Sequence, residues 1–404
     1  MSREKTDISP SESSLAPMHC TRVKEPLGPP FLTELGTGTP VWVVQRHEDV
    51  RQLLTDPRLN RAHLYAPGAP ALTLYPNLLD NPAILNNLDG PEHRRLRRTV
   101  GRAFTPRALA RWRPWISSVV DDLIDRLIES DRPTDLVDGF VRSLPIAVFS
   151  RLMDLDDLDR ERLAYWGDHA FATTAFAPQE VQKAMEDFIN FGIGLVAQRR
   201  AEPGEDLVSS LIQAADEDGE VTELHIVSLV ILLVMAGHEV STTVFGNTMV
   251  YLLTDGRDTW HELGKNEAVV PAAVDQLLRG IAISDRDVLP GFLRRAVEDV
   301  EIGGVLIPAG SVVAADTVMA NLDPEVYPED WRAEPFTPPA TPHLAFGAGP
   351  HYCLGAWLAK MEMELALHRL PKRLPGLKLA VAPEAIDWRR GLLTRSPQTL
   401  PVTW

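Results

Sequence analysis

The arrangement of apolar and polar positions divides the chain into a long helical part and shorter parts with strand-like alternation. Helical periodicity runs from residue 92 to about residue 280, and prolines and glycines break it into separate helices. Before it, residues 41–44 are typical of a strand and residues 47–57 of a short helix that ends at a proline. After it, residues 297–313 alternate as strands do, with a glycine pair where a hairpin turn belongs. The pattern predicts a mainly α-helical fold with small β-sheets.

The most apolar run, residues 226–237, indicates a helix in the core. It is too short for a bilayer, which takes roughly 20 residues, and His225 and Glu239 flank it closely. Residues 1–40 are rich in Pro, Ser and Gly, and we expect a loosely ordered N-terminal arm without the apolar core of a signal peptide. No obvious linker interrupts residues 41–404, so we expect a single large domain there.

The composition narrows the class of protein. Of 404 residues, 45% are hydrophobic and 24% are charged, which is typical of a soluble globular protein with a large core. The formal net charge of −16 argues against a protein that binds nucleic acid or anionic membranes. Two cysteines exclude a disulfide framework, a four-cysteine zinc site and an iron–sulfur site, and they suit a reducing cytoplasm.

The sharpest local feature is FGAGPHYCLG at residues 346–355, which follows a proline-rich irregular stretch. Its glycines and proline bend the backbone, and the last helix is expected directly after Cys353. At such a helix N-terminus the dipole and the unpaired backbone N–H groups stabilise a thiolate. Gly355 has no side chain, so a flat, wide group has room against the start of the helix.

Four roles of Cys353 compete. A buried structural cysteine is the commonest role of a lone cysteine, but it needs no such bend. The local signatures of cysteine-protease nucleophiles are missing. A zinc site lacks ligands, because only Cys353 and His351 are near each other and Cys20 lies in the N-terminal arm. Axial thiolate ligation of a haem iron fits best, since one cysteine suffices and a flat macrocycle explains Gly355.

FGAGPHYCLG resembles the haem-binding loop FGxGxHxCxG of the cytochrome P450 family and meets every fixed letter. The similarity extends over nearly the whole chain and is greatest to the soluble bacterial, actinomycete type. The resemblance implies a single helix-rich domain that encloses haem b, with Cys353 as the iron ligand and Phe346 beside its sulfur. It also implies an oxidoreductase that uses O2, with electrons from NAD(P)H through a ferredoxin reductase and a ferredoxin.

The resemblance further implies partners for the two haem propionates. His351 lies in the loop itself and is one expected partner. HRRLR matches the family's HxxxR, which makes His93 and Arg97 expected propionate partners as well. In LRRAVEDVEIGG the family's next arginine corresponds to Arg294 and not to Arg295. Two carboxylates in a largely buried site need cationic donors, and Arg supplies them well.

The expected core helix departs from the family at the position of a threonine. The family pattern is AGxET, and this chain has AGHEVS, with the acid kept as Glu239 and Val240 in the threonine's place. Valine cannot donate or accept a proton, whereas the family's hydroxyl helps to deliver protons for oxygen activation. Ser241 is displaced by about 100° on an ideal helix and could substitute only where the helix is locally widened. A polar group of the substrate or an ordered water is the other expected source of these protons.

A second departure concerns the family's ExxR, which here has Gln276 in place of the glutamate and keeps Arg279. Asp275 is adjacent but points elsewhere on a helix. The arginine that the family has before the haem loop has no clear counterpart, and Arg332 is a candidate stand-in. Because a glutamine carbonyl still accepts a hydrogen bond from arginine, we expect a rearranged network and not a broken fold.

Six arginines fall within fifteen residues around the HxxxR segment of an otherwise acidic chain. Arg94, Arg95, Arg98 and Arg102 have no obvious internal partner in the sequence. In the family, the face near this helix receives an acidic ferredoxin, so we expect a docking patch. A solvated basic face is the alternative.

The substrate is expected to be a medium-sized apolar or aromatic small molecule. The expected lining is apolar and aromatic and comprises Tyr65, Tyr75, Phe171, Phe176, Met235 and Phe292. The resemblance implies tailoring of a bacterial natural-product intermediate by hydroxylation, epoxidation or oxidative C–C or C–N coupling. Two alternatives stay open. One is a non-catalytic relative that acts as an auxiliary subunit of a glycosyltransferase, although such relatives lose the cysteine motif. The other is a peroxide-driven peroxygenase.

Overall fold

The structure is a computed structural model that describes residues 23–73, 80–155, 160–284 and 291–404. Its helices are α1 (His47–Thr55), α2 (Gly90–Gly101), α3 (Pro106–Ala110), α4 (Arg113–Glu129), α5 (Ser143–Leu152), α6 (Arg160–Ala170), α7 (Pro178–Ala201), α8 (Leu207–Asp218), α9 (Glu223–Leu253), α10 (Arg257–Lys265), α11 (Val270–Gly280), α12 (Thr317–Ala320) and α13 (Ala356–Arg373). Its strands are β1 (Phe31–Glu34), β2 (Pro40–Val44), β3 (Leu59–Asn60), β4 (Thr134–Asp135), β5 (Phe292–Ala296), β6 (Val300–Ile302), β7 (Val305–Ile307), β8 (Val312–Ala315), β9 (Lys378–Leu379) and β10 (Pro401–Thr403).

Small sheets accompany the helices, as the sequence predicts. The larger one has the strand order β1-β2-β8-β5-β3, in which β2 and β8 are parallel and the other pairs antiparallel. Its first strand lies within the segment that the sequence assigns to a loose arm, because residues 31–34 pair along β2. Residues 1–22 of that arm lie outside the described residues. The β6–β7 hairpin turns at the expected glycine pair, with φ values of +55° at Gly303 and +80° at Gly304.

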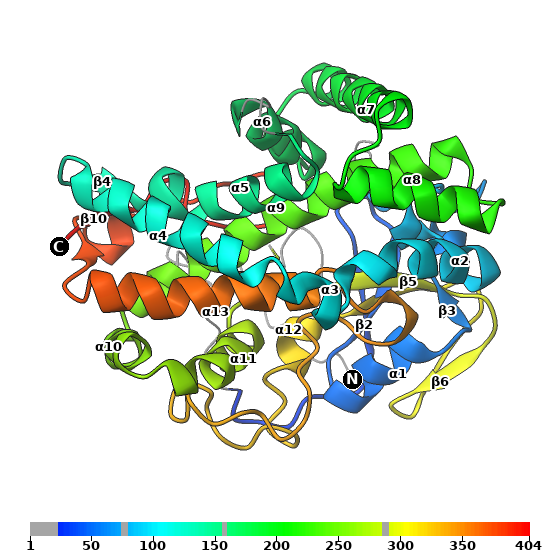
Figure 1. The fold of residues 1–404 in the computed structure, drawn as a ribbon. Coiled ribbons are helices and arrows are strands. Elements are labelled where there is room, and N and C mark those ends of the chain that lie inside the picture. The colour runs from blue at the N-terminus through cyan, green and yellow to red at the C-terminus, as the bar shows by residue number, and fades with distance from the viewer. Residues whose placement is uncertain (1–22, 74–79, 156–159, 285–290) are drawn as a thin grey trace.

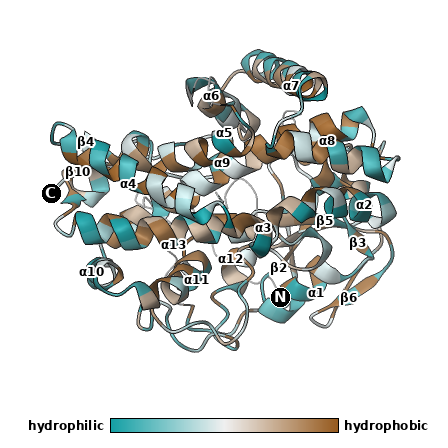
Figure 2. Ribbon diagram, in the orientation of Figure 1, coloured by the Kyte–Doolittle hydropathy of each residue, from teal (hydrophilic) through white to brown (hydrophobic). Residues whose placement is uncertain are grey.

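The apolar helix α9 runs through the middle of the molecule, with helices on several sides (Figure 1). It packs against α5, α6, α7, α8 and α10, and brown apolar stretches cover much of it in Figure 2. The side chain of Thr222 caps its start by accepting a hydrogen bond from the N–H of His225 at 3.3 Å. By length and composition alone α9 could cross a membrane, but two-thirds of its most apolar window is buried in the protein. It is therefore the predicted core helix.

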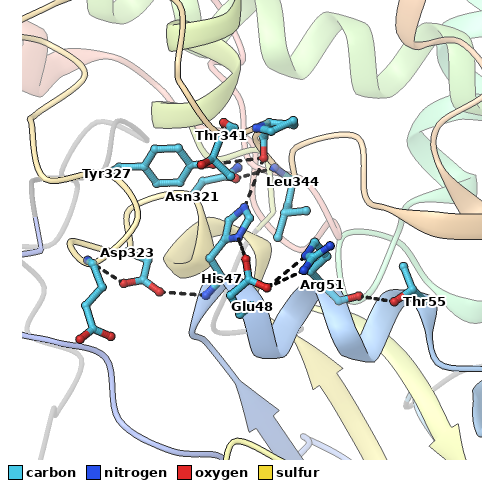
Figure 3. A network of polar contacts seen from close by, with 11 residues as sticks. His47, Glu48, Arg51, Thr55, Asn321, Asp323, Tyr327, Thr341 and Leu344 are labelled. Atoms are coloured by element: carbon cyan, nitrogen blue, oxygen red, sulfur yellow. Dashed lines mark hydrogen bonds and ion pairs between the residues drawn. The ribbon is translucent and has the colours of Figure 1, made fainter.

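Buried polar contacts fix the irregular segment before the cysteine loop to α1 (Figure 3). The backbone N–H of His47 donates to Asp323 at 2.9 Å, and the ring Nε2 of His47 lies 3.2 Å from the carbonyl oxygen of Pro342. Further along, the N–H of Leu344 donates to the side-chain oxygen of Asn321 at 2.6 Å. Buried polar groups hold a unique geometry when their bonds are satisfied. The loop that follows therefore starts from a rigid base.

Candidate active site

The segment at residues 346–355 forms the tight bend that the sequence predicts. Gly347 and Gly349 have φ values of +70° and +68°, which favour glycine. A Cβ on Gly349 would also lie 2.9 Å from the carbonyl oxygen of Leu54 in α1. The N–H of Cys353 closes the bend by donating to the carbonyl oxygen of Phe346 at 2.9 Å. Helix α13 begins two residues later than expected, at Ala356.

Cys353 is surrounded by protein and still has an accessible side chain. Burial raises the pKa of its thiol, while the backbone N–H groups of Gly355 and Ala356 and the charge of Arg97 act in the opposite direction. A Cβ added to Gly355 would meet no atom within 4 Å. The side chain of Cys353 is therefore accessible, with open space at Gly355 and with donors placed to favour a thiolate.

The central helix α9 has an accessible face. Between Ile226 and Leu253 the residues that are not fully buried are Ala236, Gly237, Val240, Ser241 and Val244. Their spacing of three and four residues puts them on one face of the helix. Two positions that the sequence singles out, Val240 and Ser241, thus lie on the accessible stripe of a core helix. The helix is regularly α-helical here, so the widening that Ser241 would need is absent in α9.

The acid of this helix faces away from the stripe. Glu239 is completely buried, and its Oε1 accepts hydrogen bonds from Nη1 of Arg389 at 2.7 Å and from the hydroxyl of Thr394 at 3.2 Å. The other guanidinium nitrogen of Arg389 donates to Asp168 of α6. Sequence reasoning missed Arg389, Thr394 and Asp168. No local motif marks them, because they come from segments about 150 and 70 residues away from Glu239.

The structure brings His93 and His351 together, with ring centroids 4.3 Å apart. Nε2 of His351 lies 3.0 Å from a carboxylate oxygen of Asp89, and Nη2 of Arg97 donates to the carbonyl oxygen of Tyr352. Burial, together with the nearby charges of His351 and Arg97, lowers the pKa of His93 to about 4. The expected propionate partners on α2 and in the loop therefore lie together in one cluster of hydrogen-bond donors, in which Arg97 carries the positive charge.

Arg294 on β5 is 3% exposed. Its Nη1 donates to the carbonyl oxygen of Leu293 at 2.9 Å, and no carboxylate among the described residues forms an ion pair with it. Burial, with a smaller effect of Arg61, lowers the pKa of Arg294 to about 9. A buried guanidinium without a bound anion is costly. Arg294 and the cluster around His351 thus suit the carboxylates of a bound group, and with the accessible Cys353 they fit haem.

The network at Gln276 is rearranged, as predicted. Oε1 of Gln276 accepts a hydrogen bond from Nε of Arg279 at 2.9 Å, and its Nε2 donates to the carbonyl oxygen of Thr337 at 2.6 Å. The guanidinium of Arg279 lies 4.5 Å from the ring centroid of Tyr327. The guanidinium of Arg332 pairs with Asp330 at 2.6 Å, and the carboxylate of Asp330 also acts electrostatically on Arg279, so Arg332 stays a candidate stand-in at the edge of this network.

The neighbouring Asp275 points elsewhere, as expected, and forms an ion pair with Lys360 at 2.5 Å. Among the other expected positions, Phe171 and Met235 are buried, and Tyr65 and Phe176 are partly buried. Phe292 is 42% exposed. Tyr75 lies outside the described residues.

The expectation that four arginines near α2 lack internal partners is wrong for three of them. Arg95 and Arg98 lie 3.4 Å and 3.5 Å from carboxylate oxygens of Asp218, and Arg102 lies 3.5 Å from Glu217. These ion pairs cannot be read from the sequence, because the acidic end of α8 packs against α2 only in the folded chain. Arg94 is exposed. The basic surface is therefore smaller than the sequence suggests.

Comparisons with known proteins identify the family of this chain. The family model for Cytochrome P450 matches residues 286–384. Nocardicin C N-oxygenase of Nocardia uniformis subsp. tsuyamanensis is 40% identical over 382 residues, which cover 93% of this chain and 92% of that protein. Mycinamicin IV hydroxylase/epoxidase of Micromonospora griseorubida is 36% identical, covering 91% of this chain and 90% of that protein.

A solved structure, cytochrome P450mel 107F1 with biaryl coupling reactivity, superposes with a TM-score of 0.85 at 34% identity, covering 93% of both chains. The fold, the cysteine loop and these relatives lead to one conclusion: this chain belongs to the cytochrome P450 family and is a haem b monooxygenase.

Proposed function

We propose that this enzyme oxidises a medium-sized apolar or aromatic intermediate of natural-product biosynthesis, by hydroxylation, epoxidation or oxidative C–C or C–N coupling. The observation that carries the proposal is the accessible, largely apolar stripe of α9 in a helix that is otherwise buried. Such a lining favours a substrate with apolar or aromatic faces. The relatives support the reaction types, since their names include N-oxygenation, hydroxylation, epoxidation and biaryl coupling.

The cofactor would be held by residues on either side of the cysteine loop. Cys353 would be the iron ligand, with the N–H groups of Gly355 and Ala356 supporting its thiolate. Phe346 would pack beside the sulfur. The propionates would meet the side chains described above, namely His93, Arg97, Arg294 and His351. Bound there, haem b supplies the activation of O2, and the chain orients the substrate over it.

Proton supply would differ from the family pattern. Val240 carries no hydroxyl, and Ser241 lies beside it on the stripe of an unwidened helix. Glu239 is held from behind by Arg389. A polar group of the substrate or an ordered water would therefore complete the path. This favours reactions in which the substrate takes part in proton transfer, including coupling.

Electrons would come from NAD(P)H through a ferredoxin reductase and an acidic ferredoxin. Arg94 is exposed on α2, and α2 meets the cysteine loop through the contact of Arg97 with the Tyr352 carbonyl. The side chains of Tyr352 and Trp357 are 39% and 52% exposed near Cys353. A positive surface with exposed aromatic rings suits an acidic partner. The cytoplasm is the proposed compartment, because the Cys353 thiol must stay reduced.

One spectrum tests the proposed cofactor chemistry. The purified protein, supplied with haemin, should give the ferrous–carbon monoxide difference spectrum of a thiolate-ligated haem, and Cys353→Ser should lose it. Candidate aromatic and macrocyclic metabolites should then shift the Soret band on titration. A colourless protein would instead favour an auxiliary subunit. Turnover with peroxide but not with ferredoxin and O2 would favour a peroxygenase.

A further inference from the structure

Arg61 lies next to Arg294 in the larger sheet, although no short motif in the sequence marks it. Asn60 of β3 pairs with Arg295 of β5, so the residue that follows Asn60 continues along β5 beside Arg294. The short 3-10 helix η1 (Ala62–Leu64) comes directly after Arg61 and stays in contact with β5. The fold therefore places a second arginine beside the buried guanidinium of Arg294.

Neutral groups hold the guanidinium of Arg61. Its Nη2 donates to the side-chain oxygen of Asn87 at 2.9 Å and to the hydroxyl of Tyr65 at 3.3 Å. Asn87 is fully buried, and its amide nitrogen donates to the carbonyl oxygen of Asn81 at 3.0 Å, which fixes the orientation of this amide. Nε of Arg61 is buried and has no hydrogen-bond partner among the described residues. Arg61 is thus held in place with one buried donor left over.

Asp89 ties the backbone at Arg61 to the cysteine loop. One carboxylate oxygen of Asp89 accepts hydrogen bonds from the backbone N–H groups of Arg61 and Ala62, at 2.6 and 2.8 Å. The other oxygen lies 3.0 Å from Nε2 of His351. Both oxygens of this carboxylate are therefore used, and Asp89 sets the position of Arg61 relative to His351.

The guanidinium groups of Arg61 and Arg294 lack a carboxylate that pairs with them in the described part of the chain. The charge of Arg61 lowers the pKa of Arg294, in addition to the larger effect of burial. Asp80 acts electrostatically on Tyr65, and it accepts a hydrogen bond from the hydroxyl of Thr73 at 3.1 Å. Like charges repel strongly away from bulk water. A bound anion would remove this repulsion and give Nε of Arg61 an acceptor.

The haem propionates are the anions that suit this place, because Arg294 and His351 are proposed propionate partners and the charge of Arg61 acts on both. A guanidinium binds a planar carboxylate well, through charge-assisted hydrogen bonds. We infer that Arg61 is a further haem-binding residue of this chain, which contacts a propionate together with Arg294 and is held there by Asn87 and Asp89. The inference rests on the cofactor site of the proposed function.

Cofactor loss measured with two forms of the cofactor tests the inference without turnover. The protein is loaded with haemin or with haemin dimethyl ester, in which both propionates are uncharged, and transfer to excess apomyoglobin is followed. Arg61→Met should speed the loss of haemin about tenfold, because charge-assisted hydrogen bonds are lost. It should leave the loss of the ester unchanged. Arg61→Lys keeps the charge but not the planar fork, so its rate with haemin should lie between the two.

Arg58→Met is the matched control, because Arg58 lies just before β3 and pairs with Asp56 at 2.6 Å near the surface. It should change neither rate. Equal acceleration of haemin and ester loss in Arg61→Met would overturn the inference, because it would show a general loosening of the fold. An unchanged rate with haemin would overturn it as well.

Resonance Raman spectra of the haemin-loaded protein give a second measurement that needs no ester. The propionate bending bands should shift in Arg61→Met and in Arg61→Lys but not in Arg58→Met, and unshifted bands in both Arg61 variants would refute a propionate contact. The carbon monoxide spectrum tests the haem-thiolate chemistry separately. A normal carbon monoxide spectrum with unchanged haemin loss in Arg61→Met would therefore refute the role of Arg61 alone and leave the proposed function standing.

Discussion

Nε of Arg279 donates a hydrogen bond to Oε1 of Gln276 across 2.9 Å, where the family's pattern has a charged pair. The second amide atom of Gln276 is also used, since Nε2 donates to the carbonyl oxygen of Thr337 at 2.6 Å. A glutamate could keep the first bond but not the second, because an ionised carboxylate has no donor. The glutamine is therefore fitted to its surroundings and is not a sign of decay.

Gln276→Glu should accordingly fail to stabilise the protein, although it restores the family's residue. The carboxylate gains a charge pair with Arg279, but it loses one hydrogen bond and faces the Thr337 carbonyl, at an expected net cost of about 1–2 kcal/mol. Thermal and urea unfolding measure this change in the free energy of unfolding. Gln398→Glu, at an exposed position, controls for the added charge. A higher Tm for Gln276→Glu would contradict this, because it would show that a glutamate fits the network better than the glutamine does.

Arg294→Met should stabilise the haem-free protein and weaken haem retention in the haem-loaded protein. Without haem, the substitution removes a buried charge that lacks an ion-pair partner among the described residues, and it should stabilise the fold by about 1–3 kcal/mol. With haem, it removes a propionate partner and should speed haem loss about tenfold or more. Unfolding of both forms and haem transfer to apomyoglobin are the measurements.

Arg295→Met is the control on the same strand, since Arg295 bonds to the carbonyl oxygens of His63 and Gly310 near the surface. It should leave haem retention unchanged. Equal effects of the two substitutions would remove Arg294 from the proposed cofactor site.

Val240→Thr should change the amount of product formed per NAD(P)H consumed. The new hydroxyl would lie on the accessible stripe of α9 and offer a proton donor that the chain now lacks, with an expected effect of about twofold or more. Val244→Thr, one turn along the same stripe, is the control. Product and hydrogen peroxide, measured per NAD(P)H consumed, decide the question. Identical coupling in all three proteins would place position 240 off the proton path.

Charge reversal at Arg94 should slow ferredoxin-driven turnover and weaken its dependence on salt. Arg94 is exposed on α2, whereas Arg98 is already paired with Asp218, so Arg98→Glu should have the smaller effect. Electrostatic steering predicts an effect of several-fold at low ionic strength that shrinks as salt is added. Arg390→Glu, in the C-terminal segment, controls for net charge. Unchanged rates for Arg94→Glu at every salt concentration would refute the docking patch.

Glu362 on α13 should make stability fall as the pH rises. It is 3% exposed, and burial raises its pKa from 4.5 to about 8. Below pH 4.5 the carboxyl is protonated in both the folded and the unfolded protein. Above that pH the unfolded chain ionises first, so stability is lost until about pH 8. Glu362→Gln should remove this loss and be more stable at pH 7 by on the order of 2–3 kcal/mol.

Urea unfolding between pH 5 and pH 8 checks this prediction. Glu364→Gln, two residues along the same helix and paired with Arg113, serves as the control. A difference between Glu362→Gln and the unchanged protein that does not grow with pH would show that Glu362 has a hidden partner.

The parts of this protein that depend on neighbours in the chain could be predicted from the sequence. The core helix follows from a run of apolar residues, and the bend before Cys353 follows from glycines that alone adopt positive φ without strain. The β6–β7 hairpin follows from its glycine pair. The cofactor residues in the loop and in the HxxxR segment could be named because each lies within a short motif.

Contacts between distant segments were decided only by the tertiary structure. The acidic partners of Arg95 and Arg98 lie on α8, about 120 residues away, and the partner of Glu239 lies in the C-terminal segment, 150 residues away. Periodicity and motif spacing describe the surroundings of a residue along the chain, whereas ion pairs and buried networks depend on how helices pack. The cysteine could therefore be found in the sequence, but the charges that surround the site had to be found in the fold.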